Sequence, residues 1–262
     1  PKSGPPPPND VIFLFTDGEE DGLLGAKAFV AEHPWAKDVK VVLNFEARGN
    51  EGPVIMFETS AGNGWLIEEF AAAAPHPRAT SLSYEIYRFM PNITDMTVFK
   101  RAGMAGLNFA HIGGHARYHT RLDSVENLDE RSLQHQGSYA LSLSRHFGNV
   151  SLAQTRRANA LYFNPFGSTF VSYSGAWLIP LTVMVALLFA AVVVLGFKAG
   201  RLTASGIALG ALGLFAAVAV SAGVVWAGWW LLRTAHNSIG LMFQQVIYSS
   251  HLYALGFLAL TL

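Results

Sequence analysis

The sequence predicts a three-layer α/β domain followed by transmembrane α-helices. Before Arg157, short runs of β-branched and aromatic residues alternate with amphipathic stretches of helical length, which is the pattern of an α/β domain. Nearly all the charge also precedes Arg157, and only Lys198, Arg201 and Arg233 carry a formal charge after it. Two long uncharged runs occupy most of this second part. We therefore expect one domain in water and one in a membrane.

Three segments follow from this division. Residues 1–155 form the predicted α/β domain, 156–175 a juxtamembrane linker, and 176–262 a membrane domain of two to three helices. About 20 apolar residues cross a hydrocarbon core of ~30 Å. Residues 176–197 and 202–232 carry no charge and are long enough. Residues 239–262 are a weaker third candidate, because two glutamines and a histidine interrupt them. A buried helix of a soluble protein is the alternative, which two such runs in succession disfavour.

Composition excludes some classes of function. The formal net charge of +0 averages over two unlike halves, so it gives no reason to expect a nucleic-acid partner. The chain has 0 cysteines, which excludes disulfides and thiolate metal sites. It opens with a proline-rich segment rather than a targeting signal and closes inside a hydrophobic run. We expect an internal fragment of a longer protein.

The first predicted strand and helix enclose a cluster of carboxylates. Residues 11–16 are expected to form a buried strand and residues 22–30 an amphipathic helix. Asp17, Glu19, Glu20 and Asp21 lie between them, at the carboxyl end of the strand, where open α/β sheets bind ligands. Adjacent carboxylates repel each other unless they are solvated or a cation lies between them. A solvated turn therefore remains the alternative to a metal site.

The remaining elements follow in order. Residues 39–45 predict a second strand that ends in Glu46, which gives Glu46 the same place at a strand end as Glu19 and Glu20. Residues 53–58 predict a third strand and residues 106–110 a fourth. Helices are expected over 63–74, from a Thr94-Asp95 cap to residue 102, and over 129–147. The last helix has one apolar face, formed by Leu133, Ala140, Leu143 and Phe147.

Three histidines are spaced by four residues. On a helix, His111, His115 and His119 would form a metal-binding stripe, but Gly113-Gly114 interrupts the segment. We therefore expect a loop after the strand at 106–110. Most histidines have ordinary hydrogen bonds, and His119 is the favoured candidate because of its setting between Tyr118 and Asp123.

Four separate blocks of sequence carry the remaining signal. They are Phe15-Thr16-Asp17-Gly18-Glu19-Glu20-Asp21-Gly22-Leu23-Leu24-Gly25-Ala26, Leu43-Asn44-Phe45-Glu46-Ala47-Arg48-Gly49, Thr94-Asp95-Met96-Thr97-Val98-Phe99 and Tyr118-His119-Thr120-Arg121-Leu122-Asp123. Together they cover most of residues 11–147 and resemble the zinc aminopeptidases of metallopeptidase family 28. The resemblance extends to the multi-pass membrane branch of that family, the endoplasmic reticulum metallopeptidase and vacuolar membrane protease type.

The resemblance implies an aminopeptidase that hydrolyses peptides with a water activated by two Zn²⁺ ions. Glu19 would be the general base, Glu20 and His119 would share one zinc, and Glu46 would bind the other. Many soluble relatives carry Asp at that last position. Asp95, Tyr118 and Asp123 would support the site without binding metal.

The family also requires a His-x-Asp motif and a bridging Asp upstream of the Glu19-Glu20 block, and this chain does not contain them. One zinc would keep two ligands and the other one, which is fewer than catalytic zinc sites use. We expect the chain alone to be inactive and the full-length protein to be active.

Two other functions stay open. Related domains in membrane complexes have lost their metals and act as non-catalytic scaffolds. Glutaminyl cyclisation, an acyl transfer, uses a similar carboxylate and histidine set with one zinc.

Lys198 and Arg201 lie between the first two predicted spans, which favours a cytoplasmic connection and an extracytoplasmic or lumenal hydrolase domain. Arg233, near the other end of the second span, reduces this bias. The expected partners are a peptide substrate and the lipid bilayer.

Overall fold

The computed structural model describes residues 6–235 and 250–261. These residues belong to two compact units, Pro1–Trp177 and Leu178–Leu262. Part of the proline-rich opening and residues 239–249 of the third predicted span lie outside the described residues.

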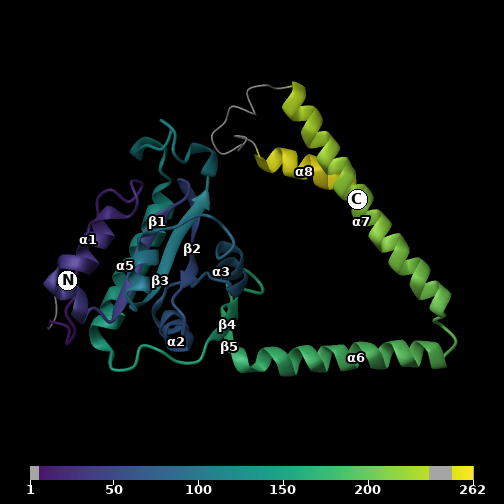
Figure 1. The fold of residues 1–262 in the computed structure, drawn as a ribbon, viewed down its shortest axis with the longest axis horizontal. Coiled ribbons are helices and arrows are strands. Elements are labelled where there is room, and N and C mark those ends of the chain that lie inside the picture. The colour runs from purple at the N-terminus through teal and green to yellow at the C-terminus, as the bar shows by residue number, and fades with distance from the viewer. Residues whose placement is uncertain (1–5, 236–249, 262) are drawn as a thin grey trace. The chain divides into compact units, whose positions relative to one another are not determined.

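A three-stranded sheet forms the centre of the first unit (Figure 1). Strands β1 (Val41–Ala47), β2 (Glu51–Thr59) and β3 (Ala105–Gly113) lie in the order β1-β3-β2. β1 runs parallel to β3, and β2 runs antiparallel to it. Register pairs Glu46 with Ala110, so Glu46 lies at the carboxyl edge of the two parallel strands. Three of the four predicted strands are present.

Helices cover both faces of the sheet, as expected for a three-layer domain. α2 (Gly64–Ala73) and α5 (Glu130–Asn149) lie on one face, where Phe109 of β3 contacts Phe70 and Tyr139. α1 (Leu24–Glu32) and α4 (Asp95–Arg101) cover the other, with Phe29 packed against Phe99. Neighbouring residues of a strand point to opposite faces, so one face of β3 is apolar while the other carries Asn108. The predicted fold class is confirmed.

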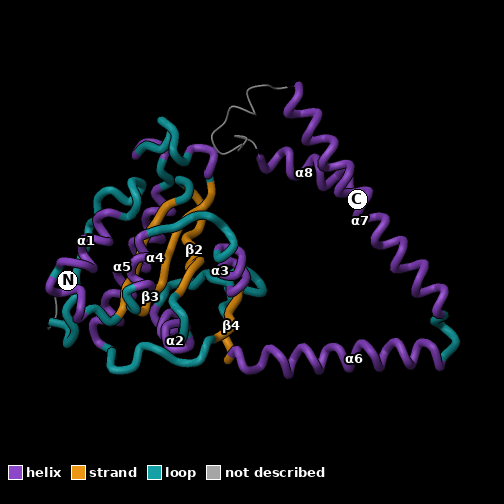
Figure 2. The backbone as a smooth tube through the Cα atoms, viewed as in Figure 1, coloured by secondary structure: helices purple, strands orange, loops and turns teal. Residues whose placement is uncertain are grey.

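Two expectations about the first unit are wrong. Residues 11–16 form no strand (Figure 2), because no strand of the described chain pairs with them. Phe13 and Phe15 are 74% and 93% exposed. Asn9 binds the carboxyl end of α5 and Thr16 binds Asp95, which anchors the run at both ends. Leu133 is exposed rather than part of the apolar face of α5.

Other elements carry no clear periodic signal. Helix α3 (Ser81–Tyr87) and a hairpin of β4 (Ala160–Phe163) and β5 (Val171–Ser174) were not predicted. The hairpin lies in the segment 156–175 that we expected as a linker. Tyr162 is 1% exposed and belongs to the main core. Short 3₁₀ turns complete the unit, and they are Pro34–Asp38, His115–Arg117, Val125–Asn127 and Gly175–Trp177.

The second unit contains long apolar helices. α6 (Leu178–Lys198) and α7 (Ala204–Ala235) correspond to the first two predicted spans, and α8 (Ser250–Thr261) lies within the third. Among the described residues, Gly175–Lys198 and Ala204–Ala235 are long and apolar enough to cross a membrane, and neither is buried in protein.

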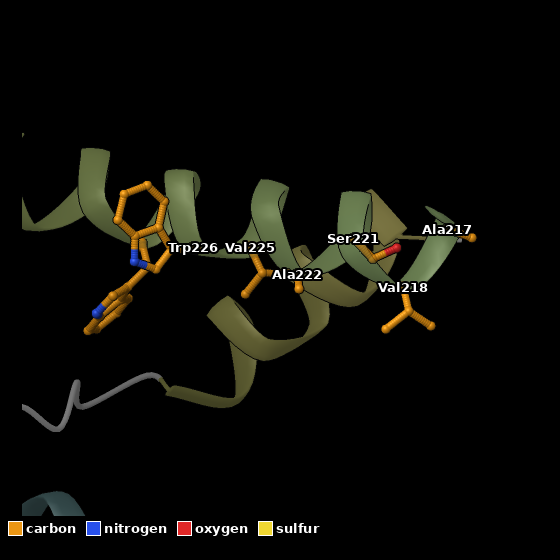
Figure 3. A pocket seen from close by; sticks show the side chains of 7 residues that line it. Ala217, Val218, Ser221, Ala222, Val225 and Trp226 are labelled. Carbon is orange, nitrogen blue, oxygen red and sulfur yellow. The ribbon is translucent and has the colours of Figure 1, made fainter. Parts of the chain in front are cut away.

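α7 also has a shallow hollow (Figure 3). No titratable side chain contributes to it, so it offers no groups for acid–base or metal chemistry. Its lining residues are Ala217, Val218, Ser221, Ala222, Val225, Trp226 and Trp229.

Candidate active site

The carboxylate turn is held against the start of α1. Gly25 donates its backbone N–H to the carbonyl of Asp17 at 2.8 Å, and Leu23 donates to Glu19 at 2.8 Å. A Cβ at Gly25 would lie 2.6 Å from the backbone nitrogen of Asp17, so only glycine lets the turn approach the helix this closely. Glu19 is half-buried and Glu20 is exposed. The turn thus presents two consecutive carboxylates in different surroundings.

Glu20 and His119 lie in direct contact although 99 positions separate them. Nε2 of His119 is 2.5 Å from Oε1 of Glu20. The ring of Tyr118 stacks on the imidazole with 3.8 Å between ring centroids, and the Arg48 guanidinium lies 5.1 Å from the Tyr118 ring. Burial raises the pKa of the Tyr118 hydroxyl, and the negative charge of Glu20 adds to the effect. Each of the four side chains thus contacts the next, in the order Glu20, His119, Tyr118, Arg48.

Glu46 occupies a more enclosed position. Its Oε1 accepts a hydrogen bond of 2.8 Å from Nδ2 of Asn44. Burial raises the pKa of Glu46 to about 7, against the opposing effect of the Asn44 hydrogen bond. The charges of Glu19, Asp95 and Glu20 raise it further. These carboxylates are therefore close enough to repel one another, as expected of groups that share a cation site.

Glu19 experiences the same crowding. Burial raises its pKa, the charges of Glu20 and Asp95 raise it further, and His119 opposes them. Asp95, 4% exposed, accepts a hydrogen bond of 2.6 Å at Oδ2 from Thr16. Its buried Oδ1 has no hydrogen-bond partner in the described chain. A buried carboxylate oxygen without a partner is unfavourable, which marks a position that a ligand could complete.

The structure brings Glu19, Glu20, Glu46, Asp95 and His119 to one region, with Tyr118 against His119. Asp123 is exposed and lies outside the contacts described above. His111 is part of β3 rather than of a loop, and its Nδ1 lies 2.9 Å from Oε1 of Gln136 on α5. The histidine stripe is therefore absent, as the two glycines indicated.

Sequence reasoning missed three contributors to this region, which are Thr16, Asn44 and Arg48. Each lies within two residues of a predicted site residue or directly beside the carboxylate turn, but none is a typical metal ligand. Asn44 had one usable signal, because residues i and i+2 of a strand share a face and Asn44 must lie beside Glu46.

The donor set suits zinc in kind but is sparse in number. Carboxylate oxygen and imidazole nitrogen are zinc donors, and protein zinc sites use three or four of them. Within residues 6–235 and 250–261, no three His, Asp or Glu side chains lie close enough together to hold a metal ion. The residues present thus fit part of a zinc centre.

Comparison with known proteins places this geometry in context. The chain is 29% identical to endoplasmic reticulum metallopeptidase 1 of Homo sapiens over 170 residues, which is 62% of this chain and 19% of that protein. It is 34% identical to putative endoplasmic reticulum metallopeptidase 1-A of Caenorhabditis elegans over 140 residues, covering 52% of this chain and 16% of the relative. The vacuolar membrane protease of Candida tropicalis is 36% identical over 145 residues, 55% of this chain and 16% of the protease.

The chain therefore spans a fifth or less of the length of these relatives. No solved structure matches it. The model of peptidase family M28 matches residues 2–144, which include the carboxylate turn, Glu46, Asp95 and His119. Because this match covers more than half of the chain, the protein belongs to peptidase family M28.

Proposed function

We propose that this chain is part of a membrane-anchored, zinc-dependent aminopeptidase that removes residues from the amino termini of peptides. The observation that carries the proposal is the contact of Glu20 with His119, made beside Glu19 and Glu46. Distant parts of the chain thereby bring an imidazole and three carboxylates to the carboxyl edge of β1 and β3. That edge is the usual ligand site of a sheet with parallel strands.

Each side chain has a distinct role in this proposal. Glu20 and His119 would hold one zinc, Glu46 would hold the second, and Glu19 would stay unligated as the general base. Bound zinc supplies Lewis-acid activation of water and of the scissile carbonyl. Glu19 accepts the proton of the attacking water and transfers it to the leaving amine. Asp95 and Tyr118 support this arrangement, Asp95 through Thr16 and Tyr118 by stacking on His119.

The number of ligands limits what the chain does alone. With Glu20 and His119 at one zinc and Glu46 at the other, neither ion reaches the three protein ligands of a catalytic zinc site. We infer that the isolated chain binds zinc weakly and is inactive, whereas the full-length protein is active. Two tight sites in a zinc titration of the isolated chain would contradict this.

Anchoring and location belong to the same proposal. The two candidate spans would anchor the protein, and the relatives are named for the endoplasmic reticulum and the vacuolar membrane. Lys198 ends α6 and Arg201 lies between α6 and α7, which favours a cytoplasmic connection there. The carboxylate region would then face the lumen or the outside of the cell.

A scaffold without catalysis is the second candidate, favoured by the lack of three clustered metal-binding side chains in the described chain. Glu19→Gln in the full-length protein separates the two. This isosteric change removes the proton acceptor, so peptide hydrolysis should fall by about 100-fold or more while zinc binding persists. Near-normal turnover of Glu19→Gln would refute the role of Glu19. Wild-type protein that binds zinc but cleaves no peptide would favour the scaffold.

A further inference from the structure

A row of polar side chains crosses all three strands beside Glu46. Asn44 of β1 is the register partner of Asn108 of β3, and Asn108 is the register partner of Glu58 of β2. Asn108 and Glu58 are 0% and 3% exposed. Buried polar groups are almost always hydrogen-bonded, and a buried carboxylate needs strong donors. The row therefore has to be considered as one network.

Each hydrogen bond of the row has a defined donor and acceptor. Lys100 of α4 donates from Nζ to Oε1 of Glu58 at 2.7 Å. Asn108 donates from Nδ2 to Oε2 of Glu58 at 2.9 Å. Asn44 in turn donates from Nδ2 to Oδ1 of Asn108 at 3.0 Å and to Oε1 of Glu46 at 2.8 Å. The network thus extends from one edge strand of the sheet to Glu46 on the other.

Glu58 fixes the orientation of the Asn108 amide, because an ionised carboxylate only accepts hydrogen bonds. Asn108 must turn its NH₂ group toward Glu58, and its second N–H is accepted by Oγ1 of Thr94 at 3.0 Å. The carbonyl oxygen of Asn108 is then left to face Asn44. Asn44 must therefore direct its own NH₂ group toward Asn108 and Glu46 together.

We propose that Asn44 is a positioning residue for Glu46 and that Glu58 sets the orientation of the Asn44 amide from across the sheet. The inference rests on the proposed function, in which Glu46 binds zinc. The amide holds Oε1 of Glu46, while no hydrogen bond within the described residues holds Oε2. Partners that orient a metal ligand in this way typically contribute about 10- to 100-fold to metal affinity or activity.

The polarity of the row yields a specific consequence for Glu58→Gln. The new amide has nearly the same shape, but Lys100 attracts its oxygen and leaves its NH₂ group facing Asn108. Asn108 then has to rotate and donate to Asn44, which brings the Asn44 carbonyl oxygen against Oε1 of Glu46. An isosteric change that does not touch Glu46 thereby replaces an attraction at Glu46 with a repulsion.

Glu69 offers a matched control. Glu69 and His146 are 2.5 Å apart, with side chains 19% and 25% exposed, against 4% and 26% for Glu58 and Lys100. Glu69 belongs to α2, on the face of the sheet opposite to α4. Glu58→Gln and Glu69→Gln each replace a partly buried carboxyl group that contacts a basic side chain. Only the first change alters the row.

The experiment measures zinc affinity of the full-length protein by competition with a chelating dye, together with kcat, KM and the unfolding temperature of the metal-free protein. Both variants should unfold at a lower temperature. In Glu58→Gln, the zinc affinity should also fall by about 10- to 100-fold, and kcat should fall while KM does not rise. In Glu69→Gln, the zinc affinity should stay at the wild-type value. Equal zinc affinities of the two variants would overturn the proposal.

Asn44→Leu provides a second variant without a change of charge. It should weaken zinc binding in the same range, and it replaces Glu58→Gln if that variant does not fold. Wild-type affinity in Asn44→Leu would refute the positioning role. Wild-type protein that binds zinc but cleaves no peptide would end the proposed function, while the zinc affinities of the variants would still test Asn44.

Discussion

At the scale of single residues, His119 is one of three residues other than glycine in the described chain that have a positive φ. Its φ is 57°, in the left-handed region that residues with a Cβ rarely adopt. Conformations of this kind persist when surrounding contacts determine them. The imidazole is held by Glu20 on one side and by the Tyr118 ring on the other. The strained backbone thus accompanies a side chain fixed in position beside the carboxylates.

His119→Asn separates the backbone role from the metal role. Asparagine tolerates the left-handed conformation better than most residues, so the unfolding temperature of the metal-free full-length protein should stay close to the wild-type value. Zinc affinity should fall by about 10-fold or more because the shorter amide replaces the imidazole donor. Unchanged zinc affinity would refute His119 as a ligand, and dye competition measures it.

The candidate site could be predicted in part. The sequence proposed Glu19, Glu20, Glu46 and His119 because their residue types carry the chemistry and their blocks resemble a family, and their roles stay a prediction. Asn44 and Arg48 were not found, since their contribution depends on register and on the path of a loop. Asp123 was expected to support the site; it is exposed, and its backbone N–H donates to the carbonyl of Thr120.

At the scale of elements, α5 is tied to the loop after α2 by Tyr139. Its hydroxyl donates to the carbonyl of His76 at 2.9 Å and accepts from the backbone N–H of Arg78 at 3.0 Å. Tyr139→Phe removes both hydrogen bonds and leaves the two partly buried backbone groups without this partner. The free energy of unfolding should fall by about 1–3 kcal/mol, measured by denaturant titration.

Tyr162→Phe is the matched control for that change. Tyr162 is as deeply buried, but its hydroxyl has no hydrogen-bond partner in the described chain. Removing an unpaired buried hydroxyl should leave stability unchanged or raise it. Equal destabilisation by the two substitutions would show that the Tyr139 hydrogen bonds contribute nothing.

The start of α5 predicts a dependence on pH. The Arg131 side chain, followed by the Arg131 backbone N–H, lowers the pKa of the Asp129 cap to about 2. A lowered folded pKa means that the stabilisation is present above the ordinary pKa of Asp, about 3.9, and is lost as pH falls through about 2. Asp129→Asn should therefore reduce the unfolding temperature at pH 5 and make little difference near pH 2. A difference that stays constant with pH would contradict this.

The secondary structure shows which elements the sequence determines locally. α4 and α5 have capping side chains, α2 has apolar spacing of its own, and all three were predicted within about two residues. Residues 11–16 have a strong β composition, but a strand needs hydrogen bonds from a neighbouring strand. The hairpin β4–β5 is short, and the residues around its buried Tyr162 do not alternate between apolar and polar. Long-range pairing, rather than composition, decided both outcomes.

At the scale of the whole molecule, the two units belong to different solvents. The first has a core of buried aromatic and aliphatic side chains and carries nearly all the charge. The described helices of the second expose their apolar side chains, which in water would be unfavourable over so large an area. The hydrocarbon core of a bilayer would solvate these apolar side chains without further protein. We propose that the carboxylate region lies outside the hydrocarbon, on the lumenal or outer side.

The absence of cysteine allows that side to be tested. Ala199→Cys lies between α6 and α7, and Ser151→Cys lies on the exposed surface of the first unit. In sealed microsomes, a membrane-impermeant maleimide should label Ala199→Cys directly, because the cytoplasmic face is outermost. Ser151→Cys should react only after permeabilisation. The reverse pattern would invert the proposed orientation, and direct labelling of both would mean that α6 does not cross the membrane.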